Sequence, residues 1–381
     1  MRDFATSEHP GVQAQLDRLA ALSLPQGRFG LETIEALCAR LGNPERHLPP
    51  VFHVAGTNGK GSTCAFLRAM LEAAGYRVHS ATKPHLVRYN ERIRLAGELI
   101  GDAALAALMA EVLDAAEDLA PSFFEVTTAA LFLAFSRTPA DVCVIEVGLG
   151  GRLDATNVIP APLVCGIASL GIDHEAFLLR PEDGVPGEPI ARIAFEKASI
   201  AKPDVPLVTQ AYPASAEAEV LRTAAAHRAP VLMRGRDWWC DATDHGFVLR
   251  DRRGECLLPR PTLPGAHQID NAALAVMMLR QQDALPVPPE AMARGIRAAR
   301  WPARLQRLGD GPLTALVPGR QVWLDGGHNP DAGLAIARHF AARDDGLHLV
   351  IGMLANKDPA ALVAPLDPLL ASISVVPAPG H

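Results

Sequence analysis

The stretch VFHVAGTNGKGST, residues 51–63, decides the fold class of this chain. Its first residues are mostly apolar, as in a buried strand, and a helical pattern runs from Lys60 to about residue 74. A strand, a glycine-rich loop and a helix in this order form the context of a phosphate-binding loop. Glycines let backbone N–H groups face phosphate oxygens, and the helix N-terminus adds partial positive charge. Lys60 would then reach the β- and γ-phosphates, and Ser62 would serve a phosphate or Mg²⁺.

The match to the pattern G-x-x-x-x-G-K-[ST] is incomplete. Val54 stands where the first glycine belongs, and Gly61 separates Lys60 from the hydroxyl. The alternative interpretation is an ordinary glycine-rich turn. The lysine and the strand–helix context favour the phosphate loop.

Apolar runs at 141–148, 163–170, 205–210 and 230–233 alternate with Ala/Leu-rich helical stretches. This alternation predicts an α/β fold with a parallel sheet and helices on both faces. Polar turns between short β-rich runs predict antiparallel hairpins at 234–262, followed by a helix from about Ile269.

A proline-rich stretch at 285–290 leads to a predicted domain boundary near residue 298. We therefore expect one domain over residues 1–297 and a smaller one over residues 298–381. The second domain should contain strands at 321–327 and 347–354, a helix at 331–343 and a third strand at the end of the chain. That strand runs into Pro-Ala-Pro-Gly-His at the end of the chain. A domain made of residues 298–381 alone is at the low end of the size that supports an independent hydrophobic core. We expect the smaller domain to be incomplete.

Composition excludes several classes of protein. Lys plus Arg is 36 against 42 Asp plus Glu, a net charge of −6, which argues against a general nucleic-acid binder. No apolar run approaches the roughly 20 residues that span a bilayer, and the N-terminus lacks a secretory signal pattern. The six cysteines show no C-x-x-C spacing and are expected to be buried thiols in a reducing compartment. These features predict a cytoplasmic protein with no membrane partner.

Three ionisable residues could carry chemistry. Glu146 ends the predicted strand 141–148, at the edge where open α/β sheets bind ligands, and a carboxylate suits Mg²⁺. Taken alone, Glu146 could equally cap a helix or pair with a base. His174 follows Asp173 in the next strand–loop segment, and a single histidine is more often structural than a ligand. Lys197 lies on a predicted helix at 190–200, where a solvated lysine paired with Glu196 or Arg192 is the plain alternative.

The phosphate loop, VAGTNGKGST, resembles that of the folylpolyglutamate synthase/dihydrofolate synthase family, relatives of the Mur peptide ligases. Further segments resemble the family in the same order along the chain: PHLVRYNERIRL (84–95), FFEVTTAALF (123–132), EVGLGGRLDATNVI (146–159), IDHEAFL (172–178), ARIAFEKASIAKP (191–203), LPGAHQIDNAALA (263–275), WPARLQ (301–306) and LDGGHNPDA (324–332).

The resemblance implies a Mur-ligase-like central domain with a parallel sheet and a smaller Rossmann-like C-terminal domain. It implies an ATP-dependent ligase that adds L-glutamate to dihydropteroate and to tetrahydrofolate through an acyl phosphate. Small-molecule substrates, Mg²⁺ and a monomeric state are the corresponding expectations. The implied nucleotide contacts are Asn58, Gly59, Lys60, Gly61, Ser62, Asn271, Arg304 and Asp325.

The resemblance also assigns the metal and substrate residues. It implies that Glu146 and His174 are Mg²⁺ ligands and that Lys197 is carbamylated, so that Lys60, His174 and Lys197 form the catalytic set. The implied substrate residues are Phe124, Arg152, Leu153, Asp154 and His328. Simple core packing is the alternative role for Phe124, and ordering of the loop is the alternative for Arg152 and Asp154.

One position departs from the family pattern. Members of the family usually carry a serine immediately before PHL, and its hydroxyl is a Mg²⁺ ligand, whereas this chain has Lys83. A lysine offers no ligand oxygen and brings positive charge. Thr82 would substitute if the loop shifted by one residue. Alternatively, Lys83 points away from the metal or contacts a phosphate.

Two other functions remain open at this point. A Mur-type ligase of cell-wall precursors would need an extra domain before the phosphate loop, for which the 55 residues before Gly56 leave no room. A non-catalytic nucleotide-binding relative of the family is the second alternative, favoured by Lys83 and by the abrupt end of the chain.

Overall fold

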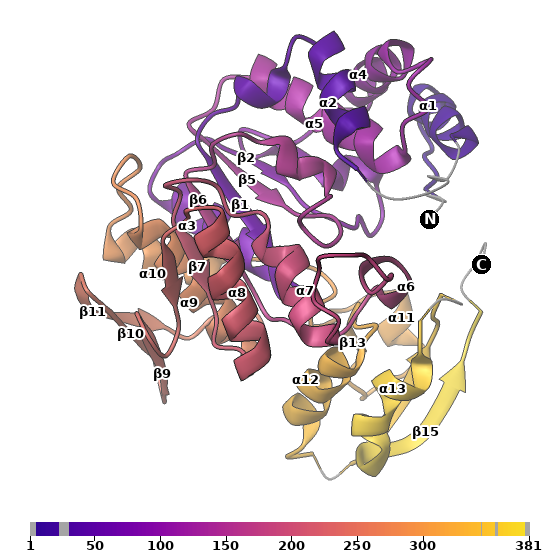
Figure 1. Ribbon diagram of the computed structural model, residues 1–381. Helices are drawn as coiled ribbons and strands as arrows, with labels where there is room; N and C mark the ends of the chain where they lie inside the picture. The colour runs from indigo at the N-terminus through magenta and orange to yellow at the C-terminus, as the bar shows by residue number, and fades with distance from the viewer. Residues whose placement is uncertain (1–4, 23–29, 344, 355–356, 378–381) are drawn as a thin grey trace.

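The computed structural model describes residues 5–22, 30–343, 345–354 and 357–377 (Figure 1). Its centre is an eight-stranded sheet with the order β4-β3-β2-β5-β1-β6-β7-β8. The six strands from β2 to β8 in this order run parallel, whereas β3 and β4 turn back antiparallel at one edge. The sheet strands are β1 (Val51–Ala55), β2 (Val78–Ala81), β3 (Ile93–Leu95), β4 (Glu98–Leu99), β5 (Val142–Glu146), β6 (Val164–Ile167), β7 (Leu207–Thr209) and β8 (Val231–Met233).

Helices cover both faces of this sheet, as the alternation of patterns predicts. One face packs against α3 (Lys60–Ala73), α9 (His267–Arg280) and α10 (Pro289–Ala298). The other face carries α4 (Asp102–Ala115) and α5 (Phe123–Arg137) over one half, and α7 (Pro189–Ala198) and α8 (Ala214–Ala226) over the other. Helices α1 (Pro10–Ala21) and α2 (Glu32–Arg40) pack outside α4 and α5, and α6 (Glu175–Leu178) is a single short turn.

The central strand β1 shows why this arrangement forms. Phe52 and Val54 face the core under α3 and α9, whereas Val51 faces the core under α5, because successive side chains of a strand point to opposite faces. All five residues of β1 are buried, which explains the nearly continuous apolar run in the sequence. Burial on both faces fixes the register of the sheet and hence the position of everything at its carboxyl edge.

The predicted hairpins at 234–262 form a separate three-stranded antiparallel sheet beside α9 and α10. Its strands are β9 (Trp239–Thr243), β10 (Gly246–Asp251) and β11 (Gly254–Pro259). The expected helix from Ile269 begins two residues earlier, at His267.

Beyond α10 the chain builds a smaller α/β region, drawn in orange and yellow in Figure 1. It contains β12 (Gln306–Arg307), α11 (Pro312–Ala315), β13 (Trp323–Leu324), α12 (Pro330–Phe340), β14 (Leu347–Ile351), α13 (Pro359–Val363) and β15 (Leu370–Val375). Short 3₁₀ turns lie at Pro44–Arg46, Tyr89–Arg92, Ala155–Val158 and Ala364–Leu369.

The strands of this smaller region do not join into one sheet among the described residues. β14 and β15 pair in parallel, as a Rossmann-like unit requires, but β13 pairs antiparallel with β12. The reason is local, because the Asp325 carboxylate directly after β13 accepts the backbone N–H of Leu305 directly before β12 at 2.7 Å. The predicted strand at 321–327 is therefore present in part, but it belongs to a hairpin. The domain boundary near residue 298 stays a prediction, and α10 ends at that residue.

Two further points concern the surroundings of the protein. No helix in the described ranges is long and apolar enough to cross a membrane. All six cysteines are free and buried.

Candidate active site

The predicted site residues gather at the carboxyl edge of the central sheet. Val54 of β1 is in register with Glu146 of β5, and Ala81 of β2 is in register with Ile145. The phosphate loop after β1, Thr82 after β2 and Glu146 therefore leave the sheet side by side. In open parallel sheets this edge is where ligands bind.

The phosphate loop has the geometry that its sequence predicts. Gly59 adopts the left-handed region, with φ +84°, directly before α3 begins at Lys60. The Lys60 ammonium lies within the loop and donates to the carbonyls of Gly56 and Thr57 at 3.0 and 3.2 Å. Ser62 is buried in the first turn of α3. The loop thus directs a cation and a helix N-terminus toward one point, which suits a polyphosphate.

A second segment holds this loop in place. The backbone N–H of Thr57 donates to the Ser169 carbonyl at 2.7 Å, and the Thr57 hydroxyl donates to the Gly171 carbonyl at 2.8 Å. These bonds tie the loop to the segment after β6, which leads to Asp173 and His174. The phosphate loop and His174 therefore share one rigid support.

The remaining predicted nucleotide residues come from α9 and from the smaller region. Asn271 on α9 lies so close that a Cβ at Gly59 would sit 2.3 Å from its Oδ1. Arg304 donates to the neighbouring Ala303 carbonyl at 2.8 Å. Both oxygens of Asp325 accept backbone N–H groups, from Leu305 and Gly327 at 2.7 Å each. In this structure Asp325 therefore orders its own turn. Each of its oxygens has one further lone pair, which is what would be available to a ribose hydroxyl.

Glu146 occupies the centre of the edge and is only 4% exposed. One of its oxygens accepts the backbone N–H of Lys83 at 3.0 Å. Burial raises the pKa of Glu146, and the charges of Lys60 and Arg304 oppose that shift. A buried carboxylate facing several cations is a site that a divalent cation would favour.

His174 and Lys197 share the neighbourhood of Lys60. Burial lowers the pKa of His174 to about 4, which leaves a neutral imidazole with a lone pair for a metal. Lys197 is 4% exposed, and burial lowers its pKa to about 7, with the Lys60 charge adding to that shift. The structure contradicts a solvated lysine here, because Glu196 pairs instead with Arg152 and Arg192.

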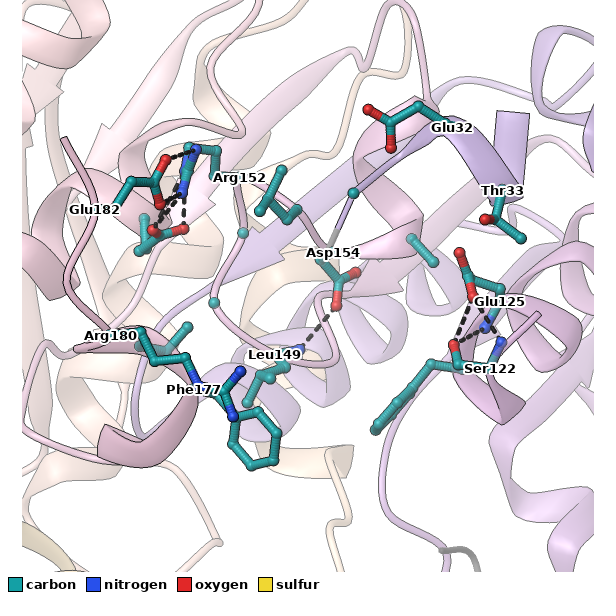
Figure 2. Close-up of a pocket in the computed structure, with 18 of the residues that line it drawn as sticks. Glu32, Thr33, Ser122, Glu125, Leu149, Arg152, Asp154, Phe177, Arg180 and Glu182 are labelled. Carbon is teal, nitrogen blue, oxygen red and sulfur yellow. Dashed lines mark hydrogen bonds and ion pairs between the residues drawn. The ribbon is translucent and has the colours of Figure 1, made fainter. Parts of the chain in front are cut away.

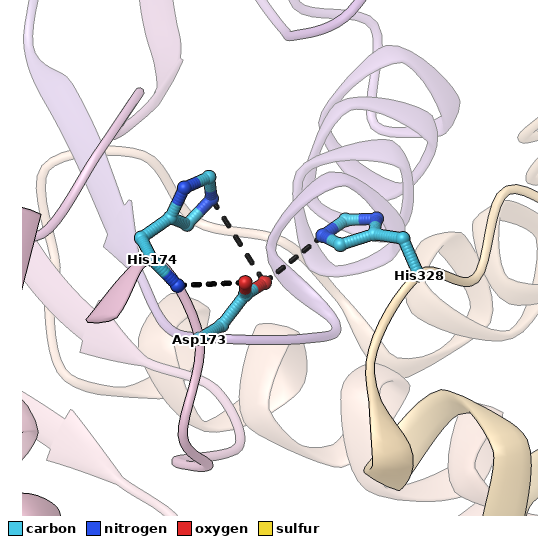
Figure 3. Close-up of side chains that lie close together, drawn as sticks. All are labelled: Asp173, His174 and His328. Atoms are coloured by element: carbon cyan, nitrogen blue, oxygen red, sulfur yellow. Dashed lines mark hydrogen bonds and ion pairs between the residues drawn. The ribbon is translucent and has the colours of Figure 1, made fainter. Parts of the chain in front are cut away.

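Asp173 connects the two regions of the chain (Figure 3). Its carboxylate accepts from His328 Nε2 at 2.9 Å, from Asn329 Nδ2 at 3.3 Å and from the Lys357 ammonium. Asn329 also exchanges amide hydrogen bonds with Asn58 of the phosphate loop at 3.0 and 3.1 Å. We name this set, Asp173, His328, Asn329 and Lys357, the clasp.

One atom each of Asp173, His174 and His328 lies within 4.8 Å of the others, close enough to hold a metal ion. The Asp173 charge is already matched by Lys357 in this arrangement. Sequence reasoning missed Lys357, and its one available signal was a lysine shortly after a predicted strand.

A cavity of about 780 Å³ opens beside this edge (Figure 2). Four of the five predicted substrate residues line it: Phe124, Arg152, Leu153 and Asp154. The fifth, His328, belongs to the clasp.

Two of the cavity residues are engaged within the protein. Arg152 pairs with Glu182 at 2.7 Å and with Glu196 at 3.0 Å. Asp154 accepts the backbone N–H of Leu149 at 2.8 Å and that of Thr156 at 3.0 Å. Both side chains therefore shape the wall of the cavity, which supports the loop-ordering alternative for them.

Lys83, the position that departs from the family pattern, and its neighbour Thr82 lie in different surroundings. Thr82 is buried at the end of β2, next to the strand that ends in Glu146. The Lys83 ammonium lies 5.8 Å from the centre of the Phe124 ring, and Phe124 lines the cavity, although Lys83 itself is not among the lining residues. The backbone of Lys83 therefore contacts Glu146 while its side chain extends toward Phe124, and the alternatives that the sequence leaves open for Lys83 stay predictions.

A phosphate loop on a parallel sheet, a buried carboxylate beside it and a second α/β region clasped over the same edge define an ATP-dependent ligase with the Mur-ligase-like fold. No protein-family model matches the chain. Individual proteins do match. It is 36% identical over 340 residues to the dihydrofolate synthase/folylpolyglutamate synthase of Escherichia coli, covering 88% of this chain and 74% of that protein. The Bacillus subtilis enzyme of the same name is 35% identical over 346 residues, with coverages of 86% and 76%.

Solved structures agree. The Escherichia coli protein FolC in complex with DHPP and ADP superposes with a TM-score of 0.83 at 34% identity, covering 97% of this chain and 84% of that one. A bifunctional folylpolyglutamate synthase/dihydrofolate synthase with Mn, AMPPNP and L-glutamate bound gives 0.81 at 30% identity, with coverages of 97% and 84%. The chain therefore belongs to the dihydrofolate synthase/folylpolyglutamate synthase family of ATP-dependent glutamate ligases, within the Mur ligase superfamily.

Coverage differs between relatives. A probable bifunctional folylpolyglutamate synthase/dihydropteroate synthase of Halobacterium salinarum is 37% identical over 349 residues, and this chain spans 40% of its length. It spans about three quarters of the two bacterial synthases above.

Proposed function

We propose that this enzyme adds L-glutamate both to dihydropteroate and to tetrahydrofolate, using Mg²⁺-ATP. The observation that carries the proposal is the position of Glu146. It lies at the same sheet edge as the phosphate loop, and Lys83, which donates its backbone N–H to Glu146, extends its side chain to 5.8 Å from the ring of Phe124, a residue that lines the cavity. A nucleotide on one side of Glu146 and a carboxylate acceptor on the other would meet there.

The reaction has two steps. A carboxylate oxygen of the acceptor attacks the γ-phosphorus, a new P–O bond forms, the bond to the β–γ bridging oxygen breaks, and ADP leaves. The glutamate amine then attacks the acyl carbon, the C–N bond forms, the bond to the phosphate oxygen breaks, and inorganic phosphate leaves with loss of a proton from nitrogen. The protein contributes by positioning the reactants and by neutralising charge.

The loop residues Asn58, Gly59, Lys60, Gly61 and Ser62 would bind the phosphates. Asn271 and Arg304 would approach the nucleotide from α9 and from the smaller region, and Asp325 would fix the turn that carries Arg304. Because these residues come from both sides of the clasp, the closed arrangement would assemble the nucleotide site and exclude water.

The donor set fits a hard divalent cation. Glu146 keeps one oxygen that accepts no hydrogen bond from a described residue, and the neutral His174 ring makes none through its nitrogens. Buried Thr82 offers a hydroxyl beside them. These residues would hold Mg²⁺, which when bound would offset charge on the transferring phosphoryl group.

Carbamylation of Lys197 would complete this environment. A buried amine that is in part unprotonated at neutral pH can add CO₂, with loss of one proton from nitrogen, to give a carbamate. The product carries negative charge where a bare ammonium would repel Lys60 and a metal. The lowered pKa of Lys197 supports this step, because only the unprotonated amine reacts.

Within the cavity, Phe124 and Leu153 would contact the flat heterocycle of the acceptor, while Arg152 and Asp154 hold the wall in shape. His328 would act through the clasp, closing the smaller region over the bound substrates. Free, buried cysteines support a reducing, cytoplasmic location. A monomeric state is part of this proposal.

The decisive experiment measures ADP release by the purified protein with Mg²⁺-ATP and glutamate, testing dihydropteroate and a reduced folate separately. Glutamate-dependent ADP release with both acceptors is expected. ADP release with only one acceptor would mean that the other acceptor is not a substrate. Binding of ATP with no release in either case would favour the non-catalytic alternative. A Mur-type ligase would instead require a nucleotide-linked acceptor, which serves as the negative control.

A further inference from the structure

Lys83 spans the boundary between the nucleotide side and the cavity side of the site. Its backbone N–H donates to Glu146 Oε2 at 3.0 Å. Its side chain runs the other way, toward the Phe124 ring on the cavity wall. A Cβ at Gly148 would lie 3.2 Å from Lys83 Nζ and 3.0 Å from Asp154 Oδ2, so the ammonium lies beside the loop that forms this wall.

The Lys83 ammonium makes no hydrogen bond and no ion pair with any residue that the structure describes. Its nearest carboxylates are committed elsewhere. Asp154 accepts from Thr156 and Leu149 within its own loop, and Glu146 accepts the Lys83 backbone. A half-buried cation without an acceptor favours a ligand that supplies the missing anion.

The surroundings of Lys83 indicate what that anion is. On the nucleotide side, Lys60 already serves the phosphate loop, and the charges of Lys60 and Arg304 act on Glu146 together with that of Lys83. In the direction of the cavity, Lys83 is accompanied by the ring of Phe124, which lines the cavity and suits contact with an aromatic ligand. An aromatic carboxylate placed against Phe124 would bring its oxygens to Nζ and remain next to the γ-phosphate. A fixed cation there would also reduce the repulsion between the two reacting anions.

We propose that Lys83 is an acceptor-binding residue whose ammonium holds the carboxylate that attacks ATP. This inference rests on the proposed function, because it assumes that a pteroate-type benzoate occupies the cavity. It assigns Lys83 to the acceptor and not to the nucleotide or the metal. It also gives a physical reason why a lysine is compatible with this position.

The test is a binding cycle that needs no turnover. Dihydropteroate and its carboxamide analogue, which lacks the negative charge, are titrated calorimetrically into the wild type and into Lys83→Met, without ATP. We expect Lys83→Met to weaken the binding of dihydropteroate by about 10- to 100-fold, the range for the loss of a hydrogen bond to a charged group. The carboxamide should bind both proteins equally, and Lys83→Arg should restore the preference for the acid.

The controls separate the possible failures. Lys202→Met removes another partly buried ammonium, which donates to the Asn157 carbonyl at 2.8 Å, and should leave the acid preference unchanged. The inference would be overturned if Lys83→Met weakened the binding of the acid and of the carboxamide equally, or if it weakened the binding of ATP and not that of the acceptor. So would unchanged binding of the acid. Failure of the wild type to bind dihydropteroate would instead overturn the proposed function. If Lys83→Met does not fold, Lys83→Gln gives the same comparison with a polar side chain.

Discussion

The clasp allows a quantitative prediction. Asp173→Asn keeps the shape of the side chain but removes the charge that faces Lys357 and His328. The side chains of Asp173 and Lys357 are 10% and 11% exposed, so their ion pair is largely withdrawn from water. Removing one partner of a buried pair costs about 3–5 kcal/mol, because the other charge stays buried and unmatched. His328 is 43% exposed, and its contact adds only tenths of a kcal/mol.

The assay is urea unfolding at pH 7, followed by limited proteolysis to locate the loosened region. We expect Asp173→Asn to lower the free energy of unfolding of the smaller region by about 3–5 kcal/mol and to expose it to proteolysis first. A double-mutant cycle with Lys357→Met should recover most of that loss, because the unmatched ammonium is gone. Turnover should fall in parallel, since Arg304 lies on the smaller region.

Asp331→Asn is the matched control. Asp331 lies near the same interface, and its carboxylate makes no hydrogen bond or ion pair with a residue that the structure describes. Burial and the Asp173 charge raise its pKa. Replacing it should be neutral or mildly stabilising at pH 7. Equal effects of Asp173→Asn and Asp331→Asn would refute the reasoning, because the clasp would then contribute no pairing energy.

The pH dependence of the clasp follows from the Asp173 carboxyl. Burial raises its pKa, but the hydrogen bond from His328, the charge of His174 and the bond from Lys357 outweigh burial and leave the pKa below the ordinary range. A depressed carboxyl pKa gives stability that is fully present above about pH 4, the ordinary value, and is lost as pH falls through the lower folded value. The difference between wild type and Asp173→Asn should therefore be constant from pH 5 to 8 and shrink only in stronger acid.

Further predictions concern the centre of the site. Lys60→Ala should reduce kcat at least about 10²–10³-fold by analogy with other charge-stabilising groups, with the thermal midpoint unchanged, and normal turnover would exclude its assigned role. Glu146→Gln should reduce turnover similarly while preserving or raising stability, because burial raises the pKa of Glu146 and a neutral amide avoids that cost; loss of folding would contradict this. ¹³C NMR with labelled bicarbonate should show a carbamate in wild type and none in Lys197→Arg. The Lys197 pKa is lowered to about 7, so wild-type stability without CO₂ should rise relative to Lys197→Met between pH 7 and about 10; a flat difference would argue against a buried amine.

The sequence by itself determined the α/β class, the phosphate loop and the family. Each of these follows from local sequence patterns. The patterns are a buried strand followed by glycines and Lys60, and apolar runs that alternate with segments of helical periodicity. Glu146 could be placed for the same reason, because the last residue of a buried parallel strand lies at the carboxyl edge of the sheet. The antiparallel sheet at 239–259 was also predictable, since its turns are short and polar.

Only the tertiary structure determined which charged residues that lie far apart in the sequence form pairs. Lys357 meets Asp173 across 184 positions, a contact without any local pattern. Burial of Lys197, commitment of Arg152 to two glutamates, and the turn of Lys83 toward Phe124 depend likewise on which surfaces meet. The strand at Trp323–Leu324 joined a hairpin because Asp325 bonds to the backbone of Leu305. Periodicity encodes which face of an element is apolar, whereas pairing and desolvation of single charges arise only when the elements have packed.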